Sequence, residues 1–308
     1  MEIDSGPGLG TEGQDFEYQH ETNALGAIGV VSKTFNSWLR KVLHYLLIAG
    51  LPSIALVSIE SNYLLFLFGI DGLNLLSYIG TSSIDTLFNY FILPYTGVTV
   101  LLAITILSFM SLVIFALIGG TVIHFTFKEN QNPGSASIGN SLSVAADRAL
   151  NLIGVQLILA AIILPLGVVS IILWIIDPLM SIVVLFFALY VAIRLLPAMT
   201  VSIVEMRDPV ASVIRSWQLT SGQFGHIFIS QIITGMVSFG FSILIAVFAA
   251  SAVVFIIPSF DLAVIIGSAI SMLLLSSIYY IFQAVLYGDL EARASIKDTT
   301  QNKEESLV

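Results

Sequence analysis

Residues 225 to 257 read GHIFISQIITGMVSFGFSILIAVFAASAVVFII and contain no Asp, Glu, Lys or Arg. A helix of ~20 apolar residues is long enough to cross the hydrocarbon core of a bilayer. A charge-free run of this length is typical of a membrane span and not of a helix in a water-soluble domain. The stretch therefore predicts a transmembrane helix, and it decides the fold class.

The rest of the chain has the same character. Hydrophobic residues make up 57% of the 308 residues and charged residues only 10%, and the mean hydropathy is +0.97. Soluble domains carry roughly 25% charged residues, so a water-exposed surface is excluded for most of this chain. Five further spans are predicted at residues 42 to 59, 97 to 126, 151 to 176, 179 to 204 and 262 to 287. The sequence predicts an all-α, polytopic transmembrane helix bundle of about six spans.

The two ends differ from this middle part in composition. Residues 1 to 23 are rich in Gly, Gln and acidic residues, and residues 294 to 308 are polar, so we expect two disordered cytoplasmic tails around a membrane domain at 24 to 293. The formal charge of −9 owes much to the first tail. An acidic tail disfavours nucleic acid as a partner.

Basic residues predict the orientation of the chain. Positively charged residues in short loops stay on the cytoplasmic side. Ten of the eleven basic residues flank the predicted spans on one side. They are Lys33, Arg40, Lys41, Lys128, Arg148, Arg207, Arg215, Arg293, Lys297 and Lys303. We therefore expect a multi-pass protein of the cell membrane with both termini in the cytoplasm.

Three short segments ahead of predicted pairs of spans show helical periodicity. Their apolar stripes include Val31, Phe35 and Trp38 in the first, Leu142 and Ala145 in the second, and Val210, Val213, Ile214 and Trp217 in the third. Such stripes, with Trp and basic residues nearby, are typical of helices that lie in the membrane interface. The third has favourable ends, with Asp208 as a cap, Pro209 at the first position and Gly222 at the exit. We interpret the chain as three repeats of an interfacial helix plus two spans, with an apolar outer loop at 60 to 96 that is a lid or a re-entrant helix.

Arg194 is the one basic residue inside a predicted span. A charge there costs at least ~3 kcal/mol on insertion scales, so it should face the bundle or a wet cavity. Two interpretations stay open. The guanidinium is satisfied internally, by carbonyls freed near Pro197 or by Gln156, Gln231 or Gln283, or it holds an anion such as a lipid phosphate.

Signatures of chemistry are missing elsewhere. Cysteine is absent, and neither a phosphate-binding loop nor a serine-hydrolase or metalloprotease motif occurs. His44, His124 and His226 share a similar predicted depth, but their spacing does not favour zinc over interfacial side chains. We expect no cofactor, no metal and no catalytic residue. Small residues at every fourth position, from Ser238 to Ala250 and from Ala263 to Ser271, predict close packing of the last two spans.

The second half of the chain resembles a known family. Arg194-x-x-Pro197 is followed by Val204-Glu205 and by PVASVIRSWQLTSG at 209 to 222, and the span region closes with AVLYGDLEAR at 284 to 293. These segments resemble the membrane domain of glycerophosphoryl diester phosphodiesterases and its stand-alone relatives. The motif residues are Pro197, Ser216, Leu219, Thr220, Tyr287, Asp289 and Arg293. The resemblance implies the membrane half only, because the barrel that hydrolyses glycerophosphodiesters in fused members has no counterpart in these residues.

The sequence thus favours a non-enzymatic integral membrane protein that contacts lipids or organises partner membrane proteins. Its partners would be membrane lipids and, in addition, other membrane proteins or a second copy of itself. Arg194, Arg215 and Trp217 are the predicted anion- or lipid-binding residues. The alternatives are a transporter or permease-like subunit and, less favoured, an intramembrane enzyme of lipid metabolism.

Overall fold

The computed structural model describes residues 24–68, 94–256 and 260–305, and these residues form helices and turns without any strand. Six helical segments are long and apolar enough to cross a membrane: Val42–Ile59, Thr105–Gln131, Ala149–Ile176, Pro178–Val204, Phe224–Ile256 and Ala263–Lys297. The predicted all-α, multi-pass membrane architecture is confirmed. The predicted tail at 1 to 23 and most of the outer loop, residues 69 to 93, lie outside the described residues.

The spans come in three successive pairs. The first pair consists of α2 (Val42–Tyr45), a π-helical turn (Leu46–Gly50), α3 (Leu51–Phe68) and α6 (Pro94–Gln131). The second consists of α8 (Ala149–Ile176) and α9 (Pro178–Leu195), which α10 (Ala198–Val204) continues. The third consists of α12 (Phe224–Ile256) and α13 (Phe260–Leu275), which α14 (Ile278–Glu305) continues. A short helix precedes each pair, namely α1 (Ala27–Arg40), α7 (Ile138–Asp147) and α11 (Pro209–Leu219), as the repeat interpretation predicts.

The ends of α11 follow the predicted capping chemistry. The Asp208 carboxylate accepts a hydrogen bond from the backbone N–H of Ala211 at 2.8 Å, and Pro209 occupies the first helical position. Gly222, just past the helix, has φ 76°, a conformation that a residue without Cβ adopts at little cost. These residues fix where the third short helix begins and ends.

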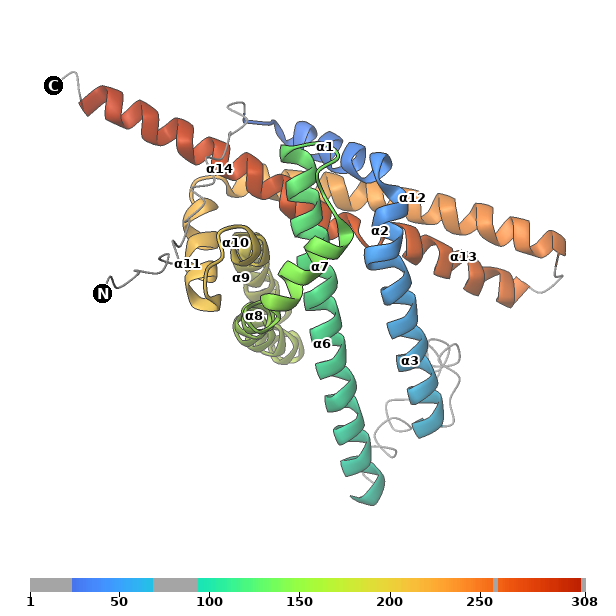
Figure 1. The fold of residues 1–308 in the computed structure, drawn as a ribbon. Helices are drawn as coiled ribbons and strands as arrows, with labels where there is room; N and C mark the ends of the chain where they lie inside the picture. Colours follow the sequence, from blue (N-terminus) through green and yellow to red (C-terminus); the bar gives the residue numbers. More distant parts are fainter. Residues whose placement is uncertain (1–23, 69–93, 257–259, 306–308) are drawn as a thin grey trace, which may run out of the picture.

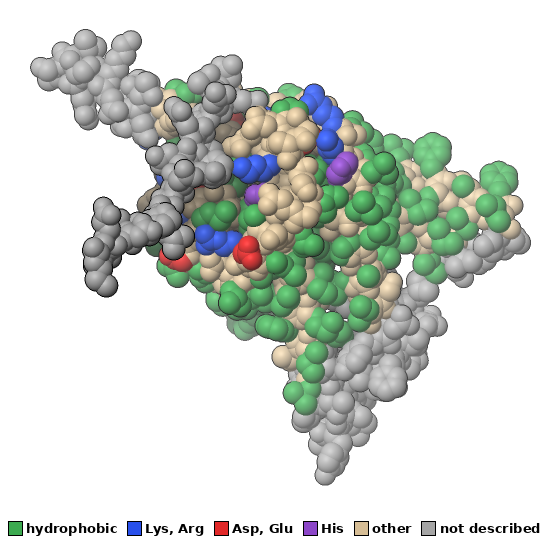
Figure 2. Space-filling model, viewed as in Figure 1, with side chains coloured by type: hydrophobic (Ala, Val, Ile, Leu, Met, Phe, Trp, Pro, Cys, Tyr) green, Lys and Arg blue, Asp and Glu red, His purple; other side chains and the backbone are tan. Residues whose placement is uncertain are grey.

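The three pairs converge at one end and diverge at the other. Figure 1 shows the α3/α6, α8/α9 and α12/α13 pairs leaving a common core in different directions. The largest buried side chains, such as Tyr45, Phe125, Ile203 and Tyr287, gather at the converging end. Apolar side chains near the far tips are exposed, with Ile175 at 82% and Phe255 at 92%, as side chains facing lipid would be. Figure 2 shows basic side chains at the converging end and hydrophobic surface along the diverging helices. We call the converging end the basic end.

A ring of contacts holds the basic end together. Each short helix packs against the pair that precedes its own: α7 against α6, and α11 against α8, α9 and α10. The first short helix, α1, closes the ring by packing against α12 and α14 of the third pair. Each pair of spans is therefore linked to the next pair by the short helix that precedes that next pair.

We call the place where a short helix packs on the preceding pair a junction. At each of the three junctions, the short helix packs against a span at a glycine or at a helix break. At the first, a Cβ added to Gly120 of α6 would lie 3.2 Å from the Ala145 Cβ of α7. At the second, α11 covers the break between α9 and α10. At the third, the Trp38 indole N–H of α1 donates to the Leu274 carbonyl at 3.0 Å, beside the break between α13 and α14. Carbonyls freed at helix breaks need such donors in a membrane.

The predicted ridge of small residues packs as expected. Ser242 of α12 and Ser271 of α13 share a hydrogen bond at 2.7 Å. A Cβ added to Gly267 would lie 2.4 Å from the Ala246 carbonyl oxygen, so the two backbones are in close contact there. This confirms the close packing that the four-residue repeat predicts.

The C-terminal boundary differs from the expected one. The helix α14 continues to Glu305, whereas the sequence predicts a disordered tail from residue 294. Lys297, Lys303, Glu304 and Glu305 are good helix formers, and a helix that is already nucleated extends at low cost. Polarity alone therefore does not end this helix.

Candidate functional site

The Arg194 side chain lies at the second junction, where only 7% of the residue is exposed. One Nη group donates to the Trp217 carbonyl at 2.6 Å, and the other donates to the Tyr190 hydroxyl at 3.2 Å. The guanidinium carbon is 4.3 Å from the centre of the Trp217 ring, a cation–π contact. Because Trp217 sits in the last turn of α11, the guanidinium satisfies a carbonyl at the negative end of that helix.

The backbone carbonyl of Arg194 also binds α11, as an acceptor, whereas the side chain is a donor. The hydroxyls of Ser216 and Thr220 each donate to the Arg194 carbonyl at 3.1 Å. The helix is interrupted between Leu195 and Ala198, beside Pro197, and the hydroxyls of α11 bind this carbonyl at the interruption. The motif residues Ser216 and Thr220 thus bind the backbone three residues before Pro197, and Leu219 packs with Val201 and Tyr287 in the core.

The charge of Arg194 has no counter-charge among the described residues. Its partners are a neutral hydroxyl, a carbonyl and two aromatic rings, and its Nε is buried without a hydrogen bond. The glutamines expected from sequence do not reach it: Gln156 donates to the Met199 sulfur, and the Gln231 and Gln283 side-chain oxygens are without partners. The acceptors are instead the Trp217 carbonyl of α11 and the hydroxyl of Tyr190, one turn before Arg194 on α9.

An apolar groove adjoins this arginine. It has a volume of about 600 Å³ and is formed by α8, α9 and α11. Its walls include Ile162, Leu166, Phe187, Leu195, Ile214 and Trp217, and Gln218 contributes a polar group. The Trp217 ring is therefore shared, because it belongs to the groove wall and to the Arg194 contact.

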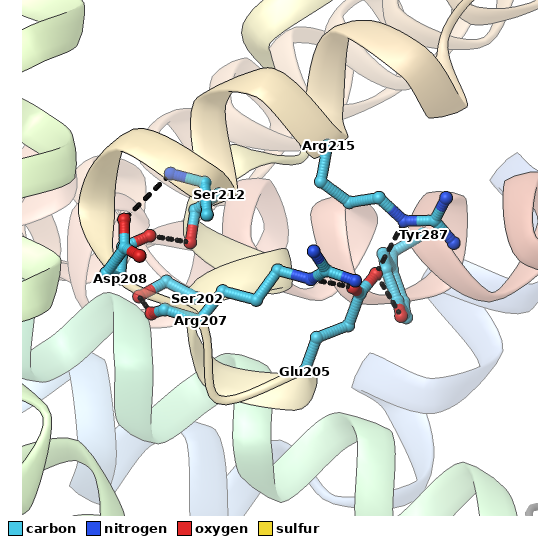
Figure 3. A network of polar contacts seen from close by, with 8 residues as sticks. Ser202, Glu205, Arg207, Asp208, Ser212, Arg215 and Tyr287 are labelled. Carbon is cyan, nitrogen blue, oxygen red and sulfur yellow. Dashed lines mark hydrogen bonds and ion pairs between the residues drawn. The ribbon is translucent and has the colours of Figure 1, made fainter.

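Arg215 takes part in a different network, centred on Glu205 at the end of α10. Glu205 Oε1 accepts from the Arg215 Nε at 3.2 Å and from the Tyr287 hydroxyl at 3.1 Å, and Oε2 accepts from the Arg207 Nε at 2.5 Å. Figure 3 shows the side chains of the α10–α11 turn, α11 and α14 meeting at this carboxylate. Arg215 thus binds Glu205, whereas Asp289 binds His226 and Arg293.

The third cluster of motif residues surrounds Asp289, whose side chain is fully buried. Asp289 Oδ2 lies 2.7 Å from the His226 Nε2 and accepts from the Arg293 Nε at 3.0 Å, while Oδ1 accepts from the Leu25 backbone N–H at 2.5 Å. Arg293 also donates to the Leu25 carbonyl. The aspartate therefore joins α14, α12 and the chain just before α1.

The histidines do not converge. His44 stacks on Phe125, His124 shares a hydrogen bond with Ser141 at 3.0 Å, and His226 binds Asp289. Within the ranges that the structure describes, no three His, Asp or Glu side chains are grouped so that they could hold a metal ion.

Comparison with known proteins adds no relative: no family model, no curated protein and no solved structure matches this chain. The resemblance to the phosphodiesterase membrane domain therefore stays a prediction. Of the residues it singles out, the structure groups Pro197, Ser216 and Thr220 at the second junction, and Tyr287 with Arg215 at Glu205. The roles of Tyr190, His226 and Leu25 were missed, because only the folded chain brings them to their partners.

Proposed function

We propose that this protein binds an anionic membrane lipid, with an acyl chain in the groove between α8, α9 and α11 and its negative group drawn to Arg194. It acts without catalysis, as a lipid-contacting protein of the cell membrane that belongs to the membrane-domain family it resembles. The basic end faces the cytoplasm in this proposal, because positively charged loops are retained there.

The buried, uncompensated charge of Arg194 carries the proposal. A charge within a span costs at least ~3 kcal/mol on insertion scales, and buried charges are normally paired. Among the residues that the structure describes, the partners of the guanidinium are neutral, and the Nε has none. A lipid phosphate supplies both a counter-charge and an acceptor of the kind that a guanidinium binds best.

The groove supports the same ligand from the apolar side. Its lining is almost entirely hydrophobic, and a volume of about 600 Å³ is large enough for part of an acyl chain. Trp217 connects the apolar space to the cation, as an aromatic ring does at the boundary between lipid tails and head groups.

Native mass spectrometry of purified protein with defined lipids tests this proposal. Arg194→Lys keeps the charge but loses the forked donor geometry, so we expect weaker adducts of phosphatidylglycerol with the fold retained. Arg194→Leu should lose them and should insert more easily, because the buried charge is gone. Identical adducts in all three proteins would refute binding at Arg194.

A second pair of variants tests the groove. Val213 lines it, so Val213→Phe should fill it and reduce lipid retention. Val247 of α12 is 57% exposed and lies outside the lining, so Val247→Phe is the matched control. Equal lipid retention by the two variants would exclude the groove as the acyl-chain site.

The transporter alternative has one observation in its favour. Spans of all three pairs are irregular near the basic end, with a π turn at Leu46–Gly50 and breaks after Leu195 and Leu275. Interrupted spans carry substrate sites in many transporters. Buried oxygens of Thr234 and Ser277 are without partners. Single cysteines at these two positions that react with a water-soluble maleimide would indicate a hydrated path and favour a transporter; protection of both would favour lipid binding.

A further inference from the structure

The Glu205 network leaves donors unused at the surface of the basic end. Arg207 and Arg215 both bind Glu205 through Nε. Among the described residues, no partner contacts the Nη groups of either arginine. Their side chains are 45% and 32% exposed, so these groups can reach a ligand outside the protein.

The network also fixes where the two guanidinium groups lie. One carboxylate, itself only 15% exposed, holds both arginines, and the Tyr287 hydroxyl holds that carboxylate from α14. Figure 3 shows the Nη end of Arg215 directed away from Glu205. Two oriented guanidinium groups lose less side-chain entropy on binding an anion than free ones do.

The backbone between α10 and α11 is held in an uncommon conformation to achieve this. Met206 has φ 55° and is the one non-glycine residue with positive φ in the described part of the chain. Such a conformation is uncommon for a residue with a long side chain, and it occurs often at functional sites. It turns Arg207 back towards Glu205, two residues before it. The neighbouring Asp208 carboxylate is engaged in capping α11.

Exposed apolar residues surround the two arginines. Met206, Val210 and Ile214 of the same turn and helix are 47%, 59% and 54% exposed. A basic pair beside an apolar surface fits the boundary between lipid tails and phosphates and not open water.

We propose that Arg207 and Arg215, positioned by Glu205, form a phosphate-binding site at the membrane interface, occupied by the phosphodiester of an anionic phospholipid. This site uses other cations than Arg194, although Ile214 beside it also lines the groove. The chemistry it recognises is a pair of phosphate oxygens, which free phosphate also presents. Phosphatidylglycerol has no cation beside its phosphodiester, whereas the choline of phosphatidylcholine carries a positive charge that the two arginines repel.

The test uses the full chain in nanodiscs or as lipid adducts in native mass spectrometry. We expect phosphatidylglycerol to be preferred over phosphatidylcholine, and the double variant Arg207→Gln with Arg215→Gln to reduce that preference by about tenfold. Arg148→Gln is the matched control, since Arg148 is also a half-buried arginine of the basic end but lies outside this network. Arg207→Lys with Arg215→Lys keeps both charges and should fall between wild type and the Gln variant.

Three results decide the matter. A preference that is lost in the Gln variant and kept in the Arg148→Gln control supports the site. Displacement of phosphatidylglycerol from wild type by millimolar inorganic phosphate, absent in the Gln variant, supports a phosphate site that soluble anions share. An unchanged preference in the folded Gln variant overturns it and, should that variant not fold, so does an unchanged preference in the Lys variant, whatever Arg194→Leu does in the separate test of the groove.

Discussion

Gly267→Ala should destabilise the third pair of spans, although alanine is the better helix former. The added Cβ would lie 2.4 Å from the Ala246 carbonyl oxygen and 3.2 Å from the Ala250 Cβ, where ordinary contacts begin at 3.4 Å. The nearest neighbour is backbone and cannot rotate away, so α12 and α13 must separate by about 1 Å. Overpacking of this kind costs about 1–3 kcal/mol.

Gly240 provides the matched control on the facing helix. Nothing lies within 4 Å of a Cβ built at Gly240, so Gly240→Ala gains helix propensity without a clash. It should stabilise the protein by roughly 0.5–1 kcal/mol. The two substitutions add the same methyl group to the same pair of helices, and we expect free energies of opposite sign.

Unfolding in mixed micelles with increasing sodium dodecyl sulfate measures both changes. The three tryptophans of the chain provide a fluorescence signal, and far-ultraviolet circular dichroism follows the helices. Gly267→Ala should lower the transition midpoint, and Gly240→Ala should leave it unchanged or raise it. If Gly267→Ala proved as stable as Gly240→Ala, the close approach of α12 and α13 would be refuted.

Three further predictions concern the basic end. Asp289→Asn removes a buried charge that three donors contact, so it should lower the free energy of unfolding by about 2–4 kcal/mol, while the exposed Asp147→Asn stays within about 0.5 kcal/mol of wild type in the same titration. Ser216→Ala with Thr220→Val leaves the Arg194 carbonyl unsatisfied and should increase hydrogen exchange of α11 relative to α7; equal exchange would contradict the docking described for α11. Single cysteines at Gln131 and Gln223 should be labelled only from the cytoplasmic side and one at Leu179 only from the other, and labelling of all three from one side would refute the orientation.

The sequence predicts this fold well wherever the signal is local. Charge-free runs locate the spans, Asp208 and Gly222 locate the ends of α11, and the four-residue spacing of small residues predicts the contact at Gly267. Each of these signals lies within one helix or at its ends. They determine where each helix begins and ends, and not which helices pack against it.

The apolar stripe of α11 shows where periodicity stops being informative. Val210, Ile214 and Trp217 were expected on one face, and they do share it, but this face is exposed while Ser212 and Ser216 are buried. In a membrane, lipid is as apolar as leucine, so helices pack through small and hydroxylated residues and turn larger apolar ones outwards. A stripe therefore identifies a face without saying whether protein or lipid covers it.

Partners across the molecule could not be predicted at all. Leu25 reaches Asp289 and Tyr287 reaches Glu205, contacts that join the first short helix to the last span and the second pair to the third. Such pairings depend on the ring in which each short helix packs on the preceding pair, and no local pattern encodes that ring. This is why the sequence did not predict that Glu205 binds Arg215 and Tyr287.

Arg194 brings a charge to the second junction, whereas neutral groups close the other two, and this difference makes it the candidate ligand-binding residue. The first junction is closed by Ala145 against Gly120, and the third by the neutral indole N–H of Trp38 on the Leu274 carbonyl. At the second junction, Ser216 and Thr220 already satisfy the carbonyl at the helix break. A neutral donor at position 194 would therefore complete the junction as Trp38 does at the third, without the cost of a buried charge. Because packing does not require the charge, the proposed lipid binding predicts that Arg194→Gln keeps the stability of the protein while losing its bound lipid.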